Sequence, residues 1–204
     1  MAAEAALREA SVALIPEDEL RAQLYHFLAR FLASPPDKTG LESAAKMDGD
    51  DTELGKAFGV FANLASRTDV NKVGQEYQDL FIGVGRGELL PYGSYYLTGF
   101  LHEKPLAKLR DDMGRLGIER EPGVNEPEDH IAALMDMMAG LITGQFGTPA
   151  PLAEQKQFFD THIASWASHF FADLEGAKSS VLYAALGTIG RHFMEIEETA
   201  FSMA

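Results

Sequence analysis

The chain has 204 residues, of which 46% are hydrophobic and 10% aromatic, a composition typical of a folded globular protein. Its 17 Lys and Arg against 31 Asp and Glu give a net charge of −14. This charge disfavours binding to nucleic acid or to an anionic membrane surface, because such binding draws on released counterions. Cysteine is absent, which excludes disulfides, thiolate metal sites, iron–sulfur clusters and cysteine nucleophiles. A cationic partner is favoured.

No segment predicts export or a membrane span. The longest apolar runs, such as residues 181 to 186, are about six residues long, against the roughly 20 residues that cross a bilayer. The first residues place Glu4 before any base and contain no long apolar core, so no secretory signal is expected. We therefore expect a cytoplasmic protein with no integral membrane segment.

The negative charge is concentrated in the second part of the sequence. Residues 1 to 120 carry 14 bases and 19 acids, whereas residues 121 to 204 carry three bases and 12 acids. No base occurs from Glu121 through Gln155. A cationic partner is expected to bind near this base-free stretch.

Apolar residues recur at steps of three and four, which predicts amphipathic helices. The first helix begins at residues 16 to 19 and ends at Pro35-Pro36. Its apolar stripe consists of Leu20, Leu24, Phe27, Leu28, Phe31 and Leu32. Two further stripes cover residues 54 to 64 and 70 to 81, and the glycines at 83 to 87 then interrupt the pattern.

Shorter elements follow the glycines. Residues 94 to 100 predict a turn of helix, and residues 105 to 116 predict a helix that ends at Gly117. Asn125 is expected to cap the next helix, since Glu128 completes a capping box and Pro127 suits the first turn. The stripe of that helix consists of Ile131, Leu134, Met135, Met138, Leu141 and Ile142.

Two last stripes each predict one helix. Their members are Phe159, Ile163, Trp166, Phe170 and Leu174, then Leu182, Ala185, Ile189, Phe193 and Ile196. No alternating strand pattern competes, and linkers are expected near residues 34 to 50, 82 to 93, 117 to 125 and 144 to 150. The sequence therefore predicts an all-α fold, a single-domain helical bundle over residues 1 to 204.

Signatures of catalysis are missing. None of the six histidines follows a Glu by three residues, which argues against a carboxylate-bridged di-iron centre. Glu88 occupies the third glycine position of a Gly-x-Gly-x-x-Gly pattern, and Ser43-Ala-Ala-Lys46 lacks the partner motifs of acyl enzymes. His162 and His169 are spaced to share a helix face with Trp166, but two imidazoles make a poor metal site. We expect no enzyme, no cofactor and no metal.

Residues 126 to 130 combine three carboxylates with one imidazole, directly before a Met-rich helix. One interpretation is a helix start, where carboxylates complement the helix dipole and no further role follows. The other is a binding site, in which a carboxylate orients His130 and makes it more easily protonated, so that the pair offers a donor and an acceptor to a ligand.

A second cluster surrounds the glycine-rich loop and also has two interpretations. Its bulky side chains suit the core-facing part of a loop, or they line a groove for an apolar peptide. The groove would be lined by Tyr77, Leu80, Phe81, Pro91 and Tyr92.

The order of these motifs resembles the TorD/DmsD/NarJ family of redox-enzyme maturation chaperones. The resemblance spans most of the chain and is carried by Tyr77-x-x-Leu80-Phe81, Pro91-Tyr92-Gly93-Ser94 and Glu126-Pro127-x-Asp129-His130. It implies a TorD-like helical fold and a non-catalytic chaperone. Such a chaperone binds the twin-arginine signal peptide of a molybdenum- or tungsten-cofactor oxidoreductase and assists folding, cofactor insertion and proofreading before export.

The resemblance also implies a site and partners. The peptide-binding residues would be Tyr77, Leu80, Phe81, Pro91, Tyr92, Glu126, Pro127, Glu128, Asp129 and His130. Asp129 with Glu121, Glu126 and Glu128 would face the arginines. The client would be of formate dehydrogenase or of dimethyl sulfoxide or trimethylamine oxide reductase type. The alternative is an assembly chaperone for a nitrate reductase type subunit, acting on folded apoenzyme. The family also implies a monomer or a domain-swapped dimer, with a possible hinge near residues 117 to 125.

Overall fold

The computed structural model describes residues 14–120 and 123–204, and within these ranges the chain contains helices and no strand. The elements in chain order are α2 (Pro16–Ala33), α3 (Lys38–Ala44), α4 (Glu53–Ala65), α5 (Val70–Tyr77), the π-helical turn η1 (Gln78–Ile82), α6 (Gly93–Thr98), α7 (Lys104–Leu116), α8 (Ile131–Thr143), α9 (Leu152–His162), α10 (Ala167–Gly176) and α11 (Leu182–Ser202). The predicted all-α class is confirmed. In the same ranges, no helix is both long and apolar enough to cross a membrane.

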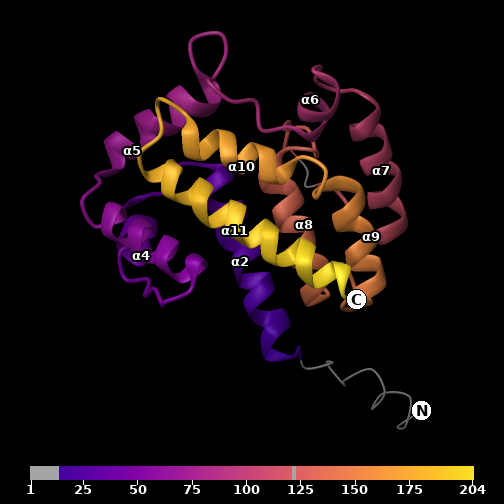
Figure 1. Cartoon of the computed structure of the whole chain (residues 1–204). Helices are drawn as coiled ribbons and strands as arrows, with labels where there is room; N and C mark the ends of the chain where they lie inside the picture. The colour runs from indigo at the N-terminus through magenta and orange to yellow at the C-terminus, as the bar shows by residue number, and fades with distance from the viewer. Residues whose placement is uncertain (1–13, 121–122) are drawn as a thin grey trace.

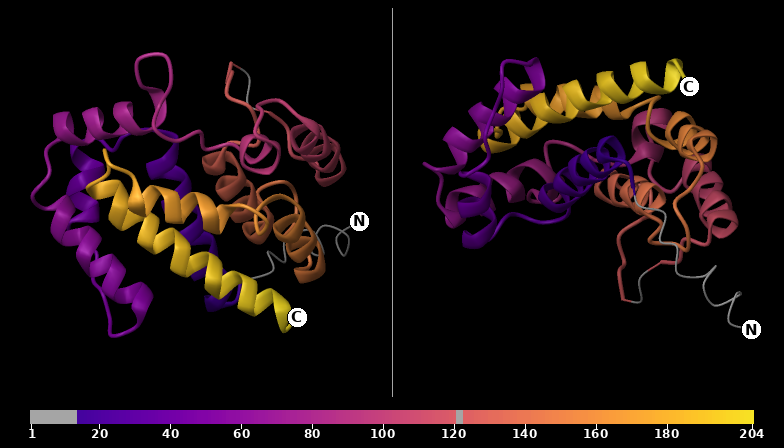
Figure 2. Two further views of the ribbon diagram at one scale, coloured as in Figure 1. Left: turned by 45° about the horizontal axis from the view of Figure 1, so that its top comes forward. Right: turned by 90° about the horizontal axis from the view of Figure 1, so that it is seen from below.

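The long helices pack in pairs. α2 packs along α8, and α10 packs along α11, which also contacts α4. Figure 1 shows α4 and α5 at one end of the molecule and α6, α7 and α9 at the other, with α10 and α11 crossing between them. In the view from below in Figure 2, α11 lies over α2.

Two glycines allow α10 and α11 to approach closely. A Cβ atom at Gly187 would lie 2.6 Å from the amide nitrogen of Glu175 and 2.8 Å from the carbonyl oxygen of Phe171. At Gly190 it would lie 2.2 Å from a ring carbon of Phe171. These contacts leave no room for a side chain, so the two glycines fix α10 against α11.

A buried ion pair connects the first and last described helices. The guanidinium of Arg21 donates to both carboxylate oxygens of Glu197, at 2.8 and 2.9 Å, and the Tyr25 hydroxyl donates to the same carboxylate at 2.9 Å. Glu197 is fully buried. The bidentate pair with its additional hydrogen bond satisfies this carboxylate within the core.

The structure confirms several predicted helix ends. α2 ends before Pro35-Pro36, and α7 ends at Gly117, which has a φ of 70°. The predicted capping box at Asn125 is wrong, because α8 begins at Ile131 and His130 is its N-cap. Instead of a first helical turn, residues 125 to 129 form a bend and a turn, and the turn is closed by a hydrogen bond from the His130 amide to the Pro127 carbonyl oxygen at 3.1 Å.

The predicted single helix through residues 159 to 174 is also wrong. α9 ends at His162 and α10 begins at Ala167, so His162 and His169 lie on separate helices and share no face. The Trp166 side chain donates a hydrogen bond from Nε1 to the His162 carbonyl oxygen at 2.8 Å. Packing of this ring, which is 1% exposed, accompanies the break in a segment whose apolar periodicity continues without interruption.

Some details of the amphipathic pattern differ as well. The predicted linker over residues 34 to 50 contains α3, which Asp37 caps by accepting a hydrogen bond from the Gly40 amide at 2.7 Å. Leu20 and Ile196 belong to predicted stripes but are exposed.

Candidate functional site

Two motifs far apart in the sequence lie side by side in the structure. The Gly93 amide donates to the Asp129 carbonyl oxygen at 2.9 Å, and the Ile131 amide donates to the Pro91 carbonyl oxygen at 2.8 Å. Tyr92 and His130 form an antiparallel bridge between these bonds. The start of α6 and the start of α8 therefore hold each other in place.

Asp129 supports the start of α6 from inside the protein. Its Oδ2 atom accepts a hydrogen bond from the Ser94 amide at 2.7 Å, and the residue is 3% exposed. Within the described residues, neither Asp129 Oδ1 nor the Ser94 hydroxyl oxygen has a hydrogen-bond partner. Buried acceptors without a donor are costly and uncommon in native proteins.

His130 caps α8 as a neutral imidazole. Its Nδ1 atom accepts a hydrogen bond from the Ala132 amide at 3.1 Å, so the ring proton is on Nε2. Burial lowers the pKa of His130 to about 4, although Glu126 and Asp129 act in the opposite direction. The expectation that the neighbouring carboxylates make His130 more easily protonated is therefore wrong, because the cost of burying the charged ring is larger.

Glu128 is already paired within the chain. Both the Nε and an Nη atom of Arg110 donate to it, at 3.0 and 2.8 Å, and Arg120 lies 3.6 Å away. Burial by itself raises the pKa of this carboxyl, but the bonds and charge of Arg110, a backbone hydrogen bond and the charge of Arg120 together hold the pKa below the usual range. Glu128 is thus less available to a ligand than its neighbours.

Glu126 is exposed and held by an aromatic residue. The Tyr92 hydroxyl donates to its carboxylate, and Arg120 donates to its carbonyl oxygen at 3.0 Å. Burial and the bond to Glu126 raise the pKa of Tyr92. The Tyr77 hydroxyl donates to carbonyl oxygens at the end of α2, and burial raises its pKa to about 12. Both tyrosines therefore act as neutral donors.

A groove lies between α2 and α8, on the His130 side of the 126–130 segment. Its volume is about 590 Å³. We call it the α2–α8 groove; its lining residues are His26, Ala29, Arg30, Ala33, Tyr77, Val124, Glu126, His130, Ala132, Ala133 and Asp136. A second hollow of about 460 Å³ shares Val124, Glu126, Ala133 and Asp136 with the groove, so the two adjoin each other.

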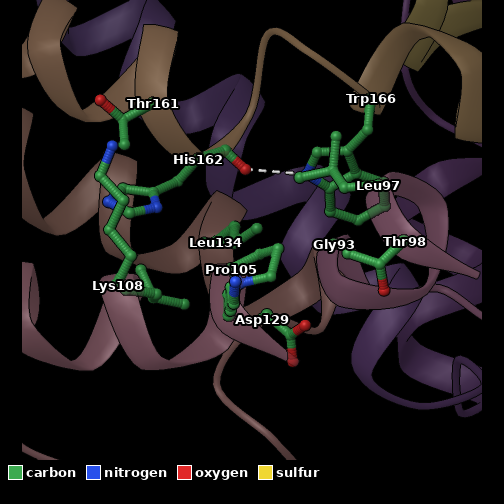
Figure 3. A pocket seen from close by; sticks show the side chains of 12 residues that line it. Gly93, Leu97, Thr98, Pro105, Lys108, Asp129, Leu134, Thr161, His162 and Trp166 are labelled. Carbon is green, nitrogen blue, oxygen red and sulfur yellow. Dashed lines mark hydrogen bonds between the residues drawn. The ribbon is translucent and has the colours of Figure 1, made fainter. Parts of the chain in front are cut away.

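A separate pocket of about 480 Å³ lies on the Asp129 side of the same segment (Figure 3). We call it the Trp166 pocket; its lining residues are Gly93, Leu97, Thr98, Lys104, Pro105, Lys108, Leu109, Asp129, Leu134, Thr161, His162 and Trp166. His162 contacts Asp112 at 2.7 Å, and burial lowers its pKa despite this carboxylate. The pocket is formed by α6, α7 and α9 together with the start of α8.

Comparison with known proteins identifies the family. The model of the nitrate reductase delta subunit family matches residues 47–172. The chain belongs to this family. The TorD chaperone of Vibrio cholerae is 29% identical over 65% of this chain and 64% of its own length. That of Aliivibrio salmonicida is 27% identical over 88% of this chain and 94% of its own.

A solved structure shows the same fold. A redox enzyme maturation protein from Archaeoglobus fulgidus superposes with a TM-score of 0.56 at 22% identity, over 86% of this chain and 93% of that protein. The predicted TorD-like fold is therefore confirmed. The curated relatives are named as chaperones.

The predicted site residues of this family member divide into three groups. Tyr77, Glu126 and His130 line the α2–α8 groove, and Tyr92 reaches it through its bond to Glu126. Asp129 faces the other pocket, and Pro127 and Glu128 line the adjoining hollow. Leu80 and Pro91 are buried, and Phe81 packs against Tyr77 and Tyr183, so these three support the walls from behind. Glu121 lies outside the described residues.

Sequence reasoning missed the contribution of two helices to the groove. His26 of α2 and Asp136 of α8 contact each other at 3.1 Å across it. The available signal was Asp136 itself, a carboxylate that interrupts the apolar sequence of α8. Because periodicity describes one helix at a time, it could not indicate which polar residues of α2 and α8 meet.

Proposed function

We propose that this chain is a cytoplasmic chaperone that binds the twin-arginine signal peptide of a molybdenum- or tungsten-cofactor oxidoreductase in the α2–α8 groove. It would hold the precursor from export while the cofactor is inserted. The observation that carries this proposal is the presence of exposed carboxylates beside a floor of small apolar residues. A twin-arginine signal peptide joins a cationic stretch to an apolar stretch and needs both surfaces.

The charged part of the groove suits a cationic peptide. Glu126 and the half-exposed Asp136 line it against one permanent cation, Arg30. The adjoining hollow adds Glu119 beside Arg120. A peptide arginine would replace His26 as the partner of Asp136. Such exposed pairs contribute little individually and are screened by salt.

The apolar part of the groove has room for larger side chains. Its lining includes four alanines, Ala29, Ala33, Ala132 and Ala133, whose small side chains leave the floor open. The neutral His130 ring carries a proton on Nε2, which can donate to a carbonyl oxygen of a bound peptide. Together these features accept an apolar segment and one polar backbone contact.

Calorimetric titration tests the proposal. A synthetic peptide with an Arg-Arg pair followed by an apolar run should bind, and its Lys-Lys version and a version with a scrambled apolar run should bind more weakly. Affinity for the Arg-Arg peptide should fall as salt rises, because salt screens the pairs between peptide arginines and carboxylates of the groove. The contribution of the apolar contacts should not fall. Failure of signal peptides from every candidate client to bind would contradict the proposal.

Matched variants test the location. Asp136→Asn should weaken peptide binding, whereas Asp111→Asn, at an exposed position of α7 outside the groove, should not. Ala133→Phe should fill the floor shared by the two hollows, whereas Ala172→Phe, at an exposed position of α10, should leave affinity unchanged. Equal effects of the paired variants would place the peptide elsewhere.

The family description favours one alternative, an assembly chaperone for a nitrate reductase type subunit. Such a protein would bind a folded apoenzyme whether or not a leader is present. A pull-down with the same apoenzyme with and without its leader separates the two functions. Equal capture of both forms, together with no calorimetric binding of the isolated leader, would favour the alternative.

A further inference from the structure

We propose that the surface around the mouth of the Trp166 pocket binds an acidic, amphipathic segment of a partner protein. It includes the end of α6, the loop at residues 99 to 103 and the first turns of α7, which Figure 1 shows at the outer edge of the molecule. We call it the α6–α7 surface; its residues are Leu97, Phe100, Leu101, Lys104 and Lys108. This inference goes beyond the proposed function, because a twin-arginine leader is cationic and this surface favours a ligand of the opposite charge.

Three large apolar side chains are grouped on the α6–α7 surface. Phe100 is 68% exposed, Leu97 43% and Leu101 39%. Single exposed apolar residues are common on soluble proteins, whereas a group of them beside a hollow is typical of an interaction site. The Trp166 pocket, of about 480 Å³, continues the apolar lining inward through Pro105 and Leu109. There is therefore room for an apolar side chain of a partner.

Local hydrogen bonds fix the loop that presents Phe100. The Thr98 hydroxyl donates to the Ser94 carbonyl oxygen at 2.8 Å and accepts from the Phe100 amide at 3.2 Å. His102, in the same loop, has a φ of 61°, a left-handed conformation that is unfavourable for a residue other than glycine. Backbone strain of this kind is concentrated at binding sites. The loop thus holds the Phe100 ring outward, where it is hydrated unless a partner covers it.

Two lysines form the charged rim of the surface. Lys104 and Lys108 are four residues apart on α7, so their side chains lie on the same face of the helix. Both are exposed, and in the described ranges neither lies within ion-pair distance of a carboxylate, whereas Lys56 and Lys156 each pair with one. In a chain with a net charge of −14, two such cations beside an apolar hollow favour an anionic partner at this place.

The carboxylate inside the pocket does not reverse this preference. Asp129 Oδ2 accepts the Ser94 amide at 2.7 Å, and Asp129 Oδ1 is buried from solvent. Figure 3 shows Lys108 reaching toward Thr161, on the side of the pocket away from Trp166. A ligand at the mouth therefore contacts the lysines and not this carboxylate.

The partner that fits this surface combines carboxylates and apolar side chains on one face. Acidic residues four apart on a helix would match the spacing of Lys104 and Lys108, and a leucine or phenylalanine beside them would enter the pocket next to Leu97. An acidic segment without apolar residues would make only screened pairs, which contribute little. An apolar segment without acids would gain nothing from the lysines.

A synthetic peptide tests the surface by calorimetry and fluorescence. The probe is a blocked, helix-forming peptide that carries glutamates at i and i+4 and leucines on the same face. It should bind in a saturable way and change the emission of Trp166, which lines the pocket and is the one tryptophan of the sequence. A version with glutamine for each glutamate, and another with serine for each leucine, should each bind about tenfold more weakly.

Charge variants separate the rim from the overall field. Lys104→Glu combined with Lys108→Glu should weaken binding of the acidic probe by about tenfold and leave the glutamine version unchanged. Lys56→Glu combined with Lys72→Glu alters the net charge equally at exposed positions of α4 and α5, and should change affinity by less than about twofold. Equal losses in the two double variants would overturn the proposal.

An apolar pair of variants tests the loop. Phe100→Ser should weaken both the acidic probe and its glutamine version several-fold, with no loss of thermal stability, because the ring is exposed. Val60→Ser, at an exposed position of α4, should leave both affinities unchanged. Sedimentation without any peptide checks for a second copy of the chain. A dimer that Phe100→Ser dissociates would assign the surface to self-association and overturn the proposal.

The leader peptide and the acidic probe should bind at the same time. Saturation with the Arg-Arg peptide should leave the affinity for the probe within about twofold, once the heat of mixing the two peptides without protein is subtracted. Displacement of the probe by the leader would overturn the separate surface, and so would no saturable binding or equal binding of the glutamine or serine version. Each of these leaves the proposed function standing if the leader binds. If the probe binds and the leader does not, the proposed function fails and the α6–α7 surface stands.

Discussion

Lowering the pH should destabilise the protein through His130. The imidazole caps α8 through Nδ1, which can accept the Ala132 amide only while that nitrogen is unprotonated. Burial lowers the pKa of His130 to about 4 in the folded protein, against roughly 6.5 in an unfolded chain. The unfolded state therefore binds more protons than the folded state between these two values, so stability is retained above pH 6.5 and is lost as the pH falls toward 4.

The size of the effect follows from the two pKa values. Between pH 7.5 and pH 5 the unfolded His130 becomes almost fully protonated while the folded one stays mostly neutral, which lowers the free energy of unfolding by about 2 kcal/mol. Urea unfolding at both pH values measures it. His162 has a lowered pKa as well, so the comparison needs a variant that changes only His130.

His130→Asn is that variant, because an Asn side chain can still accept the Ala132 amide but does not titrate. The stability lost between pH 7.5 and pH 5 should be smaller in this variant by about 2 kcal/mol. Equal losses in the two proteins would show that His130 is not held neutral in the fold. A larger loss in the variant would mean that the carboxylates of Glu126 and Asp129 stabilise a charged ring, which refutes the burial argument.

Three further changes test the packing and the site. Glu197→Ala removes the buried carboxylate that pairs with Arg21, which keeps only Asp18 and Gln155 as partners, and should lower the free energy of unfolding by about 3–5 kcal/mol, whereas the exposed Glu198→Ala should cost less than about 0.5 kcal/mol in the same urea experiment. Gly187→Ala should cost about 1–3 kcal/mol in thermal unfolding, and Gly176→Ala, which has open space around it, should not destabilise by overpacking. Glu128→Gln should lower the melting temperature slightly but leave leader affinity unchanged by calorimetry, because Arg110 already occupies its carboxylate; a large loss of affinity would show that Glu128 binds the peptide.

Local patterns were sufficient where one helix end depends on neighbouring residues. Pro35-Pro36 ends α2 and Gly117 ends α7, as the chemistry of proline and glycine predicts. The start of α8 was not predictable in this way, because the Asn125 capping box is a good local signal that tertiary contacts override. Hydrogen bonds between the Pro91 and Gly93 region and residues 129 to 131 hold the turn before α8 in place.

The break between α9 and α10 has a similar origin. Residues 159 to 174 keep their apolar period and contain neither proline nor glycine, so periodicity favours one helix. The break instead accompanies Trp166, whose indole packs under Gly93 and bonds to the His162 carbonyl oxygen. The turn depends on contacts that Trp166 makes with both α6 and α9. The sequence pattern of a single segment does not contain such contacts.

The motifs predicted which segments meet but not how they divide the site. Asp129 lies in the turn before α8 and His130 is the N-cap of that helix, and these two neighbouring side chains lie on different sides of the segment. They therefore line different cavities, and the pair does not act as one acceptor and donor toward one ligand. A change at either residue can still affect both cavities, because the backbone bridge to Tyr92 is shared.

The net charge alone does not show where a cationic partner binds, because some of the acids are already paired with bases of the same chain. Of the acids after residue 120, Glu128 binds Arg110, Glu175 binds Arg191 and Glu197 binds Arg21. These carboxylates stabilise the fold and contribute little field outside it. Among the exposed acids after residue 120, Glu126 and Asp136 lie at one groove. If charge acts locally, neutralising these two should weaken leader binding more than neutralising any other two exposed acids, although every such pair lowers the net charge equally. Equal losses for all pairs would mean that the protein attracts its partner through its overall field.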